Sequence, residues 1–131
     1  MDVDFVVLVH DEIIARTGGL SGLAGGGKGG IESALFRVRN YAEYEALDDI
    51  LGISAMYAVS IARGHCFNDG NKRTALACAL AYLKQQGVTV QEDPVLEDVM
   101  VEVALGNIER DDFAAMLGVL SDIENEAPPE E

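Results

Sequence analysis

Apolar residues recur three and four positions apart along most of this chain, and this spacing constrains its fold more than any other feature. In the clearest example they fall at Ile31, Ala34, Leu35, Val38 and Ala42. These positions form one face of an α-helix, whereas a strand would alternate apolar and polar residues. Similar spacing returns in other segments, and no two strand-like segments are joined by a hairpin turn. The sequence therefore predicts an all-α fold, a compact bundle of about six helices.

Glycine and proline residues indicate where the expected helices begin and end. The segment DFVVLV is rich in β-branched residues and is compatible with a strand. Its continuation through HDEIIAR favours one helix from Val3 to Arg16, ending at Gly18-Gly19. Later helices are expected from residue 31, from about 48 to 64, from about 71 until Gly87, from 94 to 105, and from about 110 to 123. The apolar helix 71–83 suits the middle of the bundle.

Size and charge exclude several classes of protein. A chain of 131 residues forms one domain, which we expect over residues 1–125, with a frayed acidic tail at 126–131. Direct binding to nucleic acid or to an anionic membrane needs a basic surface, and a chain with a net charge of -14 does not favour one. Two cysteines are too few for a disulfide framework, and no apolar run reaches the ~18 residues of a membrane span. We therefore expect a cytoplasmic protein in a reducing compartment.

Residues 18–30 hold eight of the fourteen glycines, and we expect them to form a loop. Within them, GLAGGGKG matches a Walker A loop except for its final hydroxyl residue, and Gly25, Gly27 and Gly30 match the spacing of a dinucleotide-binding turn. Both motifs require a preceding strand, which the pattern does not provide. The sequence therefore favours a flexible flap, in which Lys28 makes at most a loose contact with phosphate or a partner.

The segment ARGHCFNDGNKRTAL, residues 62–76, reverses the charge of the chain. Three of the nine Lys and Arg residues fall here within eleven positions, at Arg63, Lys72 and Arg73, together with His65, one of two histidines. The segment also joins the end of one expected helix to the start of the next. Backbone N–H groups at a helix N-terminus are free to bind an anion, so this junction is a candidate phosphate site.

Three residues at this junction indicate its chemistry. Gly70 has no Cβ, so a ligand can approach the turn closely. Asp69 would repel a phosphate unless a cation lay between them, which indicates Mg²⁺ held by Asp69 and phosphate oxygens. His65 precedes the turn, and histidine is the side chain best suited to take a proton from an attacking hydroxyl near neutral pH.

At this point the sequence resembles a known family. HCFNDGNKR is similar to the signature loop of the Fic family, His-x-Phe-x-Asp/Glu-Gly-Asn-x-Arg. Most Fic enzymes carry a second glycine where this chain has Lys72, and the lysine resembles the death-on-curing (Doc) toxins. The LVHDEIIARTGGL opening, the ESAL helix and the SAMYAVSIARGH approach extend the resemblance over most of the chain. It implies the Fic/Doc fold, with a central helix after the signature loop.

The resemblance implies a Mg²⁺-dependent transferase. Fic proteins usually transfer a nucleoside monophosphate to a protein hydroxyl. Doc toxins bind ATP the other way round and transfer its γ-phosphoryl group to a threonine of elongation factor Tu, which stops translation. The implied roles are His65 as base, Asp69 on Mg²⁺, and a nucleotide- or phosphate-binding set: Arg63, Asn68, Gly70, Asn71, Lys72 and Arg73. A Phd-like antitoxin, with a disordered tail that folds onto the bundle, would restrain such a toxin.

Alternative interpretations stay open at this point. Arg63 also suits a cation at a helix C-terminus, and Asp69 or Asn71 suits a cap of the next helix. Two other functions fit the motif besides a Doc-like kinase: a Fic nucleotidyltransferase that transfers AMP despite Lys72, and a non-catalytic module that binds a nucleotide or a partner. Only Lys72 discriminates between the two enzymes.

Two residues that follow His65, and the second histidine of the chain, are expected to be structural. Cys66 lies beside His65, but neighbouring side chains diverge, and we expect it to be packed rather than nucleophilic. Phe67 is expected to be a buried anchor of the loop. His10, in the first helix, is expected to be a structural hydrogen-bonding residue.

Overall fold

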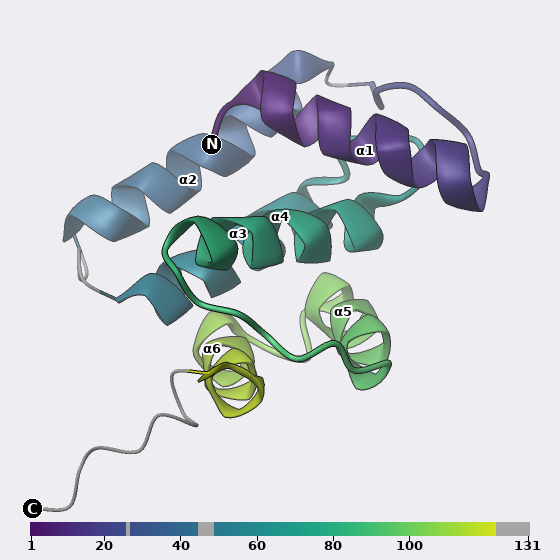
Figure 1. Ribbon diagram of the computed structural model, residues 1–131. Helices are drawn as coiled ribbons and strands as arrows, with labels where there is room; N and C mark the ends of the chain where they lie inside the picture. Colours follow the sequence, from purple (N-terminus) through teal and green to yellow (C-terminus); the bar gives the residue numbers. More distant parts are fainter. Residues whose placement is uncertain (26, 45–48, 123–131) are drawn as a thin grey trace, which may run out of the picture.

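The computed structural model describes residues 1–25, 27–44 and 49–122, which contain six α-helices (Figure 1). They are α1 (Val3–Thr17), α2 (Lys28–Tyr44), α3 (Ile50–Gly64), α4 (Asn71–Gln85), α5 (Val95–Leu105) and α6 (Arg110–Leu120). None of these helices is long and apolar enough to cross a membrane. The predicted all-α bundle is confirmed. The tail predicted at 126–131 lies outside the described residues.

The helices lie in three layers (Figure 1). In this view α1 and α2 form the upper layer, α3 and α4 lie in the middle, and α5 and α6 lie below and are seen almost end-on. α3 packs against α2, α4, α5 and α6, while α4 packs against α1, α3 and α5. The helix that follows the candidate phosphate loop therefore lies centrally, as expected, and shares this position with the helix that precedes the loop.

Small side chains allow α3 and α4 to approach each other closely. Ala55 and Ala58 of α3 and Ala75 and Ala79 of α4 are completely buried. The buried Ser54 hydroxyl donates a 2.8 Å hydrogen bond to the Ala79 carbonyl, which offsets the cost of removing this polar group from water. The loop between α3 and α4 is therefore attached at both ends to closely packed helices.

The start of α2 differs from the sequence prediction. α2 begins at Lys28, so Gly29 and Gly30 belong to its first turn rather than to the glycine-rich loop. A glycine in a helix costs about 1 kcal/mol relative to alanine. Ile31 follows at once and is fully buried, and its packing offsets this cost. Glycine content alone therefore overestimated the length of the loop.

The end of α6 also comes earlier than predicted, at Leu120 rather than near residue 123. Ser121 is extended and pairs with Val90, in the link between α4 and α5. The Gln91 N–H donates to the Leu120 carbonyl at 2.8 Å. This short extended link provides the hydrogen bonds that another helical turn would have supplied.

Candidate active site

His65 ends α3 in an unusual backbone conformation. Its φ of 48° and ψ of 49° lie in the left-handed region, and it is the only non-glycine residue with positive φ in the described ranges. This region is costly for most L-residues, although histidine enters it more often than branched residues do. The residue is exposed, at the start of the loop 65–70 that joins α3 to α4. A substrate arriving from solution can therefore reach it.

The first turn of α4 has the features of an anion site. Its N-cap is Gly70, and among the described residues no side chain accepts a hydrogen bond from the N–H groups of the turn, so neither Asp69 nor Asn71 caps the helix. The turn contains no acid, whereas Lys72 and Arg73 both lie in it and are exposed. A cation at the positive end of a helix dipole is unfavourable by about 0.3–1 kcal/mol. A bound anion would remove this conflict.

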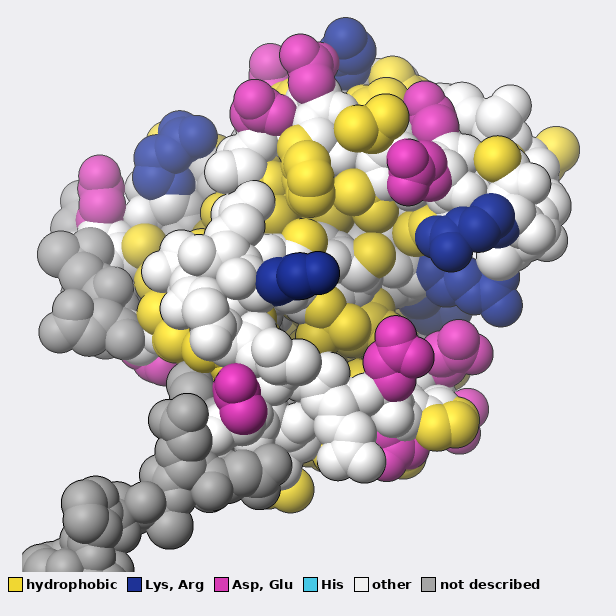
Figure 2. Space-filling view, viewed as in Figure 1, with side chains coloured by type: hydrophobic (Ala, Val, Ile, Leu, Met, Phe, Trp, Pro, Cys, Tyr) yellow, Lys and Arg dark blue, Asp and Glu magenta, His cyan; other side chains and the backbone are white. Residues whose placement is uncertain are grey.

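Basic side chains gather on this part of the surface. Figure 2 shows Lys and Arg side chains together on the right-hand side of the molecule, over the end of α4 that lies toward the C-terminal end of α1. Acidic side chains lie both above and below this basic group. In a chain with a net charge of -14, this local excess of positive charge is the part of the visible face best suited to attract a phosphate.

Asn71 braces the 65–70 loop from inside. Its Oδ1 accepts a hydrogen bond from the Phe67 N–H at 2.9 Å, and its Nδ2 donates to the Phe67 carbonyl at 2.8 Å. Phe67 is 3% exposed, which confirms the expected buried anchor. The predicted phosphate ligand Asn71 therefore has its side chain engaged within the loop, and its backbone N–H is the group that remains for a ligand.

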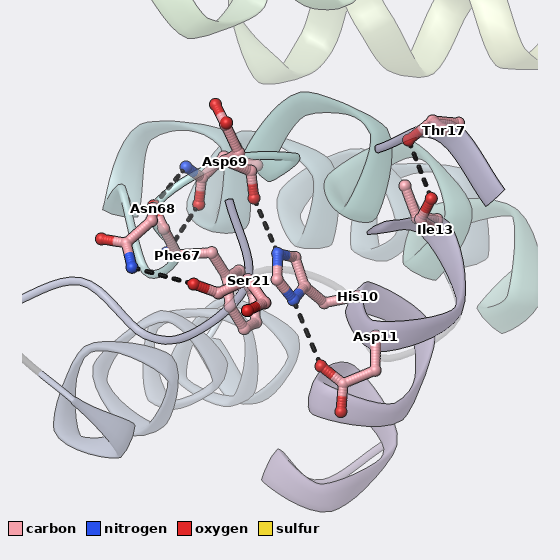
Figure 3. Close-up of polar contacts among 9 residues, drawn as sticks. His10, Asp11, Ile13, Thr17, Ser21, Phe67, Asn68 and Asp69 are labelled. Atoms are coloured by element: carbon pink, nitrogen blue, oxygen red, sulfur yellow. Dashed lines mark hydrogen bonds and ion pairs between the residues drawn. The ribbon is translucent and has the colours of Figure 1, made fainter. Parts of the chain in front are cut away.

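The glycine-rich segment is attached to the same loop rather than free. Leu23 pairs with Phe67 in an antiparallel bridge, and the Asn68 N–H donates to the Gly22 carbonyl at 3.1 Å. The Asn68 side-chain amide also donates to the Ser21 carbonyl at 3.1 Å (Figure 3). Residues 20–24 are therefore tied to the 65–70 loop rather than projecting from the fold as a free flap. Asn68, predicted to bind a nucleotide, directs its Nδ2 to this segment.

Asp69 is held at two points. Its Oδ2 accepts a hydrogen bond from the Leu20 N–H at 2.9 Å, and its carbonyl accepts one from His10 Nε2 at 2.7 Å. In the described part of the chain no cluster of three His, Cys, Asp or Glu residues is suited to a metal ion. Mg²⁺ commonly binds through one or two carboxylates, waters and substrate phosphates. An exposed Asp69 beside the N-terminus of α4 fits that donor set.

Comparison with protein families matches residues 1–83 to the Fic/DOC family. The chain belongs to the Fic/Doc family. It is 44% identical over 103 residues to "Protein kinase doc" of Escherichia phage P1, which covers 79% of this chain and 80% of that protein. It is also 44% identical over 61 residues to "Toxin Doc" of Mycolicibacterium smegmatis, covering 44% of this chain and 47% of that protein.

The side chain of Arg63 bonds α5 and the turn that follows it rather than the candidate phosphate loop of this Fic/Doc domain. Its Nε donates to the Val103 carbonyl at 2.9 Å, and its Nη2 donates to the Ile108 carbonyl at 3.0 Å. Its Nη1 forms an ion pair with Glu109 at 3.2 Å. The guanidinium therefore joins α3 to the lower layer, and this geometry does not support the predicted phosphate contact of Arg63. A cation near a helix C-terminus, the alternative interpretation, describes it better.

Gly70 is required for a different reason from the one expected. Its φ of 80° favours glycine, and a Cβ added there would lie 3.3 Å from Ile14 Cδ1 and 3.4 Å from His10 Cδ2. The absent side chain therefore makes room for α1 of the Fic/Doc domain, not for a ligand. Cys66 is buried as expected, and burial raises the pKa of its thiol above the usual range, with a smaller opposing effect from Arg37.

Sequence reasoning missed Arg37 of α2. Its Nη2 lies 3.9 Å from the position of a Cβ added at Gly64, so its guanidinium reaches the end of α3 next to His65. It is exposed. Nothing in the sequence links a residue of the second helix to a loop almost thirty positions later, because the rotation of α2 about its axis decides where Arg37 points.

Proposed function

We propose that this Fic/Doc protein is a Doc-like toxin that transfers the γ-phosphoryl group of ATP to a threonine hydroxyl of a protein target. The target is elongation factor Tu, its modification arrests translation, and the enzyme acts in the cytoplasm. The observation that carries the proposal is the 44% identity, over 79% of the chain, to a protein named as a kinase. The geometry of the 65–70 loop and the first turn of α4 agrees with this chemistry.

His65 is the general base of the proposed reaction. It takes the proton of the threonine hydroxyl while the hydroxyl oxygen forms a bond to the γ-phosphorus. The bond from that phosphorus to the oxygen that bridges to the β-phosphate breaks, and ADP leaves. The exposure of His65 supports this role, because the attacking hydroxyl belongs to another protein and must approach from outside.

The first turn of α4 binds the phosphates in this proposal. The N–H groups of the turn have no side-chain cap, and the two exposed cations Lys72 and Arg73 neutralise negative charge. Lys72 adds bulk and charge where most Fic enzymes have glycine, which disfavours the usual nucleotide orientation and favours the reversed one. The reversed orientation presents the γ-phosphoryl group to the base.

Asp69 is the protein ligand proposed for Mg²⁺, together with ATP phosphate oxygens. The Leu20 N–H holds Oδ2 of Asp69, which limits the directions that the carboxylate can take. Bound Mg²⁺ supplies charge neutralisation at the phosphates. We also propose a Phd-like antitoxin as partner, with a disordered tail that folds onto the bundle, since one relative is named "Toxin Doc".

The test is the group added to purified elongation factor Tu. The protein is incubated with the target, Mg²⁺ and ATP labelled at the α or the γ position, with a chelator in a parallel sample. We expect γ label, a mass gain of about 80 Da on a threonine, and no reaction with the chelator. A gain of about 329 Da with α label would show that the protein transfers AMP and is not a kinase. An unmodified target would favour the third interpretation, a non-catalytic module that binds a nucleotide or a partner.

Lys72 decides between the two transfer reactions, and Lys72→Gly tests it. We expect Lys72→Gly to lose most γ-phosphoryl transfer, because it removes a phosphate-binding cation and reopens the space that the usual nucleotide orientation needs. The matched control is Lys84→Gly, the same change in the last turn of α4. Equal γ-transfer by Lys72→Gly and Lys84→Gly would show that Lys72 does not select the reaction.

A further inference from the structure

α1 carries a buried histidine against the underside of the 65–70 loop. His10 is 1% exposed, which is unusual for a residue with two polar ring atoms. Figure 3 shows its ring between the loop and Asp11, with one nitrogen directed at Asp69 and the other at the Asp11 carboxylate. The expected structural hydrogen bond is confirmed, and its geometry carries a further consequence for the proposed phosphate site.

The hydrogen bond of His10 has a defined direction. Nε2 lies 2.7 Å from the carbonyl oxygen of Asp69, and because a carbonyl only accepts, Nε2 carries the proton and donates. The ring is also stacked on Phe67, with 3.8 Å between ring centroids and an angle of 6° between the planes. The stacking fixes the plane of the His10 ring, and the hydrogen bond fixes the direction in which Nε2 points.

The bonded carbonyl belongs to the peptide unit that precedes the N-cap of α4. In a planar trans peptide the C=O and the following N–H point in opposite directions. His10 draws the Asp69 carbonyl toward α1, so the Gly70 N–H points away from α1. No hydrogen bond from this N–H to a described residue is found. It is free to serve as a donor beside the N–H groups of the first turn of α4.

Side chains of α1 fill the space where a Gly70 side chain would lie. A Cβ at Gly70 would meet His10 Cδ2 at 3.4 Å, His10 Nε2 at 3.5 Å and Ile14 Cδ1 at 3.3 Å. α1 therefore leaves no room for a side chain at the N-cap. The loop's other internal brace, the amide of Asn71, bonds Phe67 and does not reach the 69–70 peptide.

We propose that His10 is a positioning residue that sets the 69–70 peptide so that the Gly70 N–H faces bound phosphate. This inference rests on the proposed phosphate site and deepens it: α1 becomes a part of the anion-binding machinery without touching the anion. A merely structural histidine would affect folding stability alone. A positioning histidine also decides whether the folded protein binds MgATP.

Two substitutions separate the contributions of His10. His10→Gln keeps an N–H donor at a similar reach and loses the stacked ring, whereas His10→Phe keeps the ring and loses the donor. Each folded variant is titrated with MgATP, and the Gly70 amide is followed by NMR of glycine-labelled protein. We expect His10→Phe to weaken MgATP binding about tenfold, because the Gly70 N–H would lose its hydrogen bond to a charged phosphate oxygen. His10→Gln stays within about threefold of wild type, because the donor remains.

The Gly70 signal gives the readout that a structural role would not move. At saturating MgATP the signal shifts equally in wild type and His10→Gln, and it shifts less in His10→Phe. Wild-type binding and a wild-type Gly70 shift in folded His10→Phe would overturn the proposal. If His10→Phe does not fold, the Gln variant decides, and its failure to bind MgATP while folded would also overturn it.

The test also distinguishes failure of the proposed function. The carbonyl carbon resonance of Asp69 reports its hydrogen bond without any nucleotide. If wild type does not bind MgATP, the phosphate site itself is wrong. A carbonyl shift in His10→Phe but not in His10→Gln would still establish the orienting hydrogen bond. An Asp69 carbonyl unchanged in both variants would overturn the role of His10 independently of ATP.

Discussion

His65 combines a reactive side chain with a left-handed backbone, and this combination decides how its role is best tested. We expect His65→Asn to abolish phosphoryl transfer while the melting temperature stays near that of wild type. Asparagine adopts the left-handed region readily, but its amide cannot take a proton near neutral pH. Loss of a general base costs about 10²–10⁴ in rate. The measurements are the initial rate of transfer from γ-labelled ATP and a thermal melt.

Binding of MgATP provides the control for His65→Asn. A base that acts only during transfer leaves nucleotide affinity nearly unchanged, so a titration with MgATP should resemble that of wild type. A variant that transfers phosphate at the wild-type rate would show that another group accepts the proton.

The residues of the candidate site differ in how far sequence could place them. His65, Asp69, Lys72 and Arg73 lie within nine positions, so one short loop and one helical turn bring them together whatever the rest of the fold does. Arg63 is as close in sequence, yet its guanidinium turns to the lower layer. The direction of a long side chain depends on neighbours that pack against its helix, and no local pattern encodes them.

At the scale of elements, Arg63 is the main polar link between α3 and the turn from α5 to α6. We expect Arg63→Gln to lower the free energy of unfolding by about 1–3 kcal/mol, because two partly buried carbonyls, those of Val103 and Ile108, lose a charged donor. MgATP affinity should stay unchanged, since the guanidinium does not face the phosphate site. Urea unfolding and a nucleotide titration check the two halves of the prediction.

Glu109→Gln is the matched control for the Arg63 link. It removes only the ion pair with an exposed carboxylate, and such pairs contribute about 0–1 kcal/mol. If Arg63→Gln reduced MgATP affinity and left stability intact, the earlier assignment of Arg63 to the phosphate site would be restored.

The helices themselves were largely predictable, and their arrangement was not. The stop at Gly106 follows from local chemistry: it takes a left-handed C-cap, as glycine does at helix ends. Asp49 caps α3 by accepting from the Gly52 N–H, again a local effect. The attachment of residues 20–24 to the 65–70 loop joins segments more than forty positions apart, and such pairing is decided by tertiary packing that composition does not report.

At the scale of the whole molecule, the packed middle layer predicts a loss of stability in alkali. Cys78 is fully buried, and burial raises the pKa of its thiol from 9.0 to about 12. Between these values the unfolded chain loses a proton that the folded protein keeps. Stability is therefore complete below pH 9 and falls as pH rises toward 12, by at most about 1.4 kcal/mol per pH unit from this thiol.

Urea unfolding of wild type and Cys78→Ala from pH 8 to pH 11 measures this effect. Burial also raises the pKa values of Tyr57 and Tyr82, so both proteins lose stability in alkali. We expect a shallower decline above pH 9 for Cys78→Ala, whatever its stability at pH 8. Identical declines in the two proteins would show that the thiol ionises as readily in the folded state as in the unfolded chain.

The two hydrogen bonds that hold Asp69 come from residues 59 and 49 positions earlier in the chain. Contacts of such separation form late in folding, because closing a long loop costs entropy before any packing compensates for it. During synthesis α1 is made before the 65–70 loop to which His10 and Leu20 bond. The two hydrogen bonds from Arg63, at the end of α3, form only after Val103 and Ile108 have been made. In a nascent chain the loop of the candidate phosphate site is therefore held in place only after segments well beyond that loop have been made.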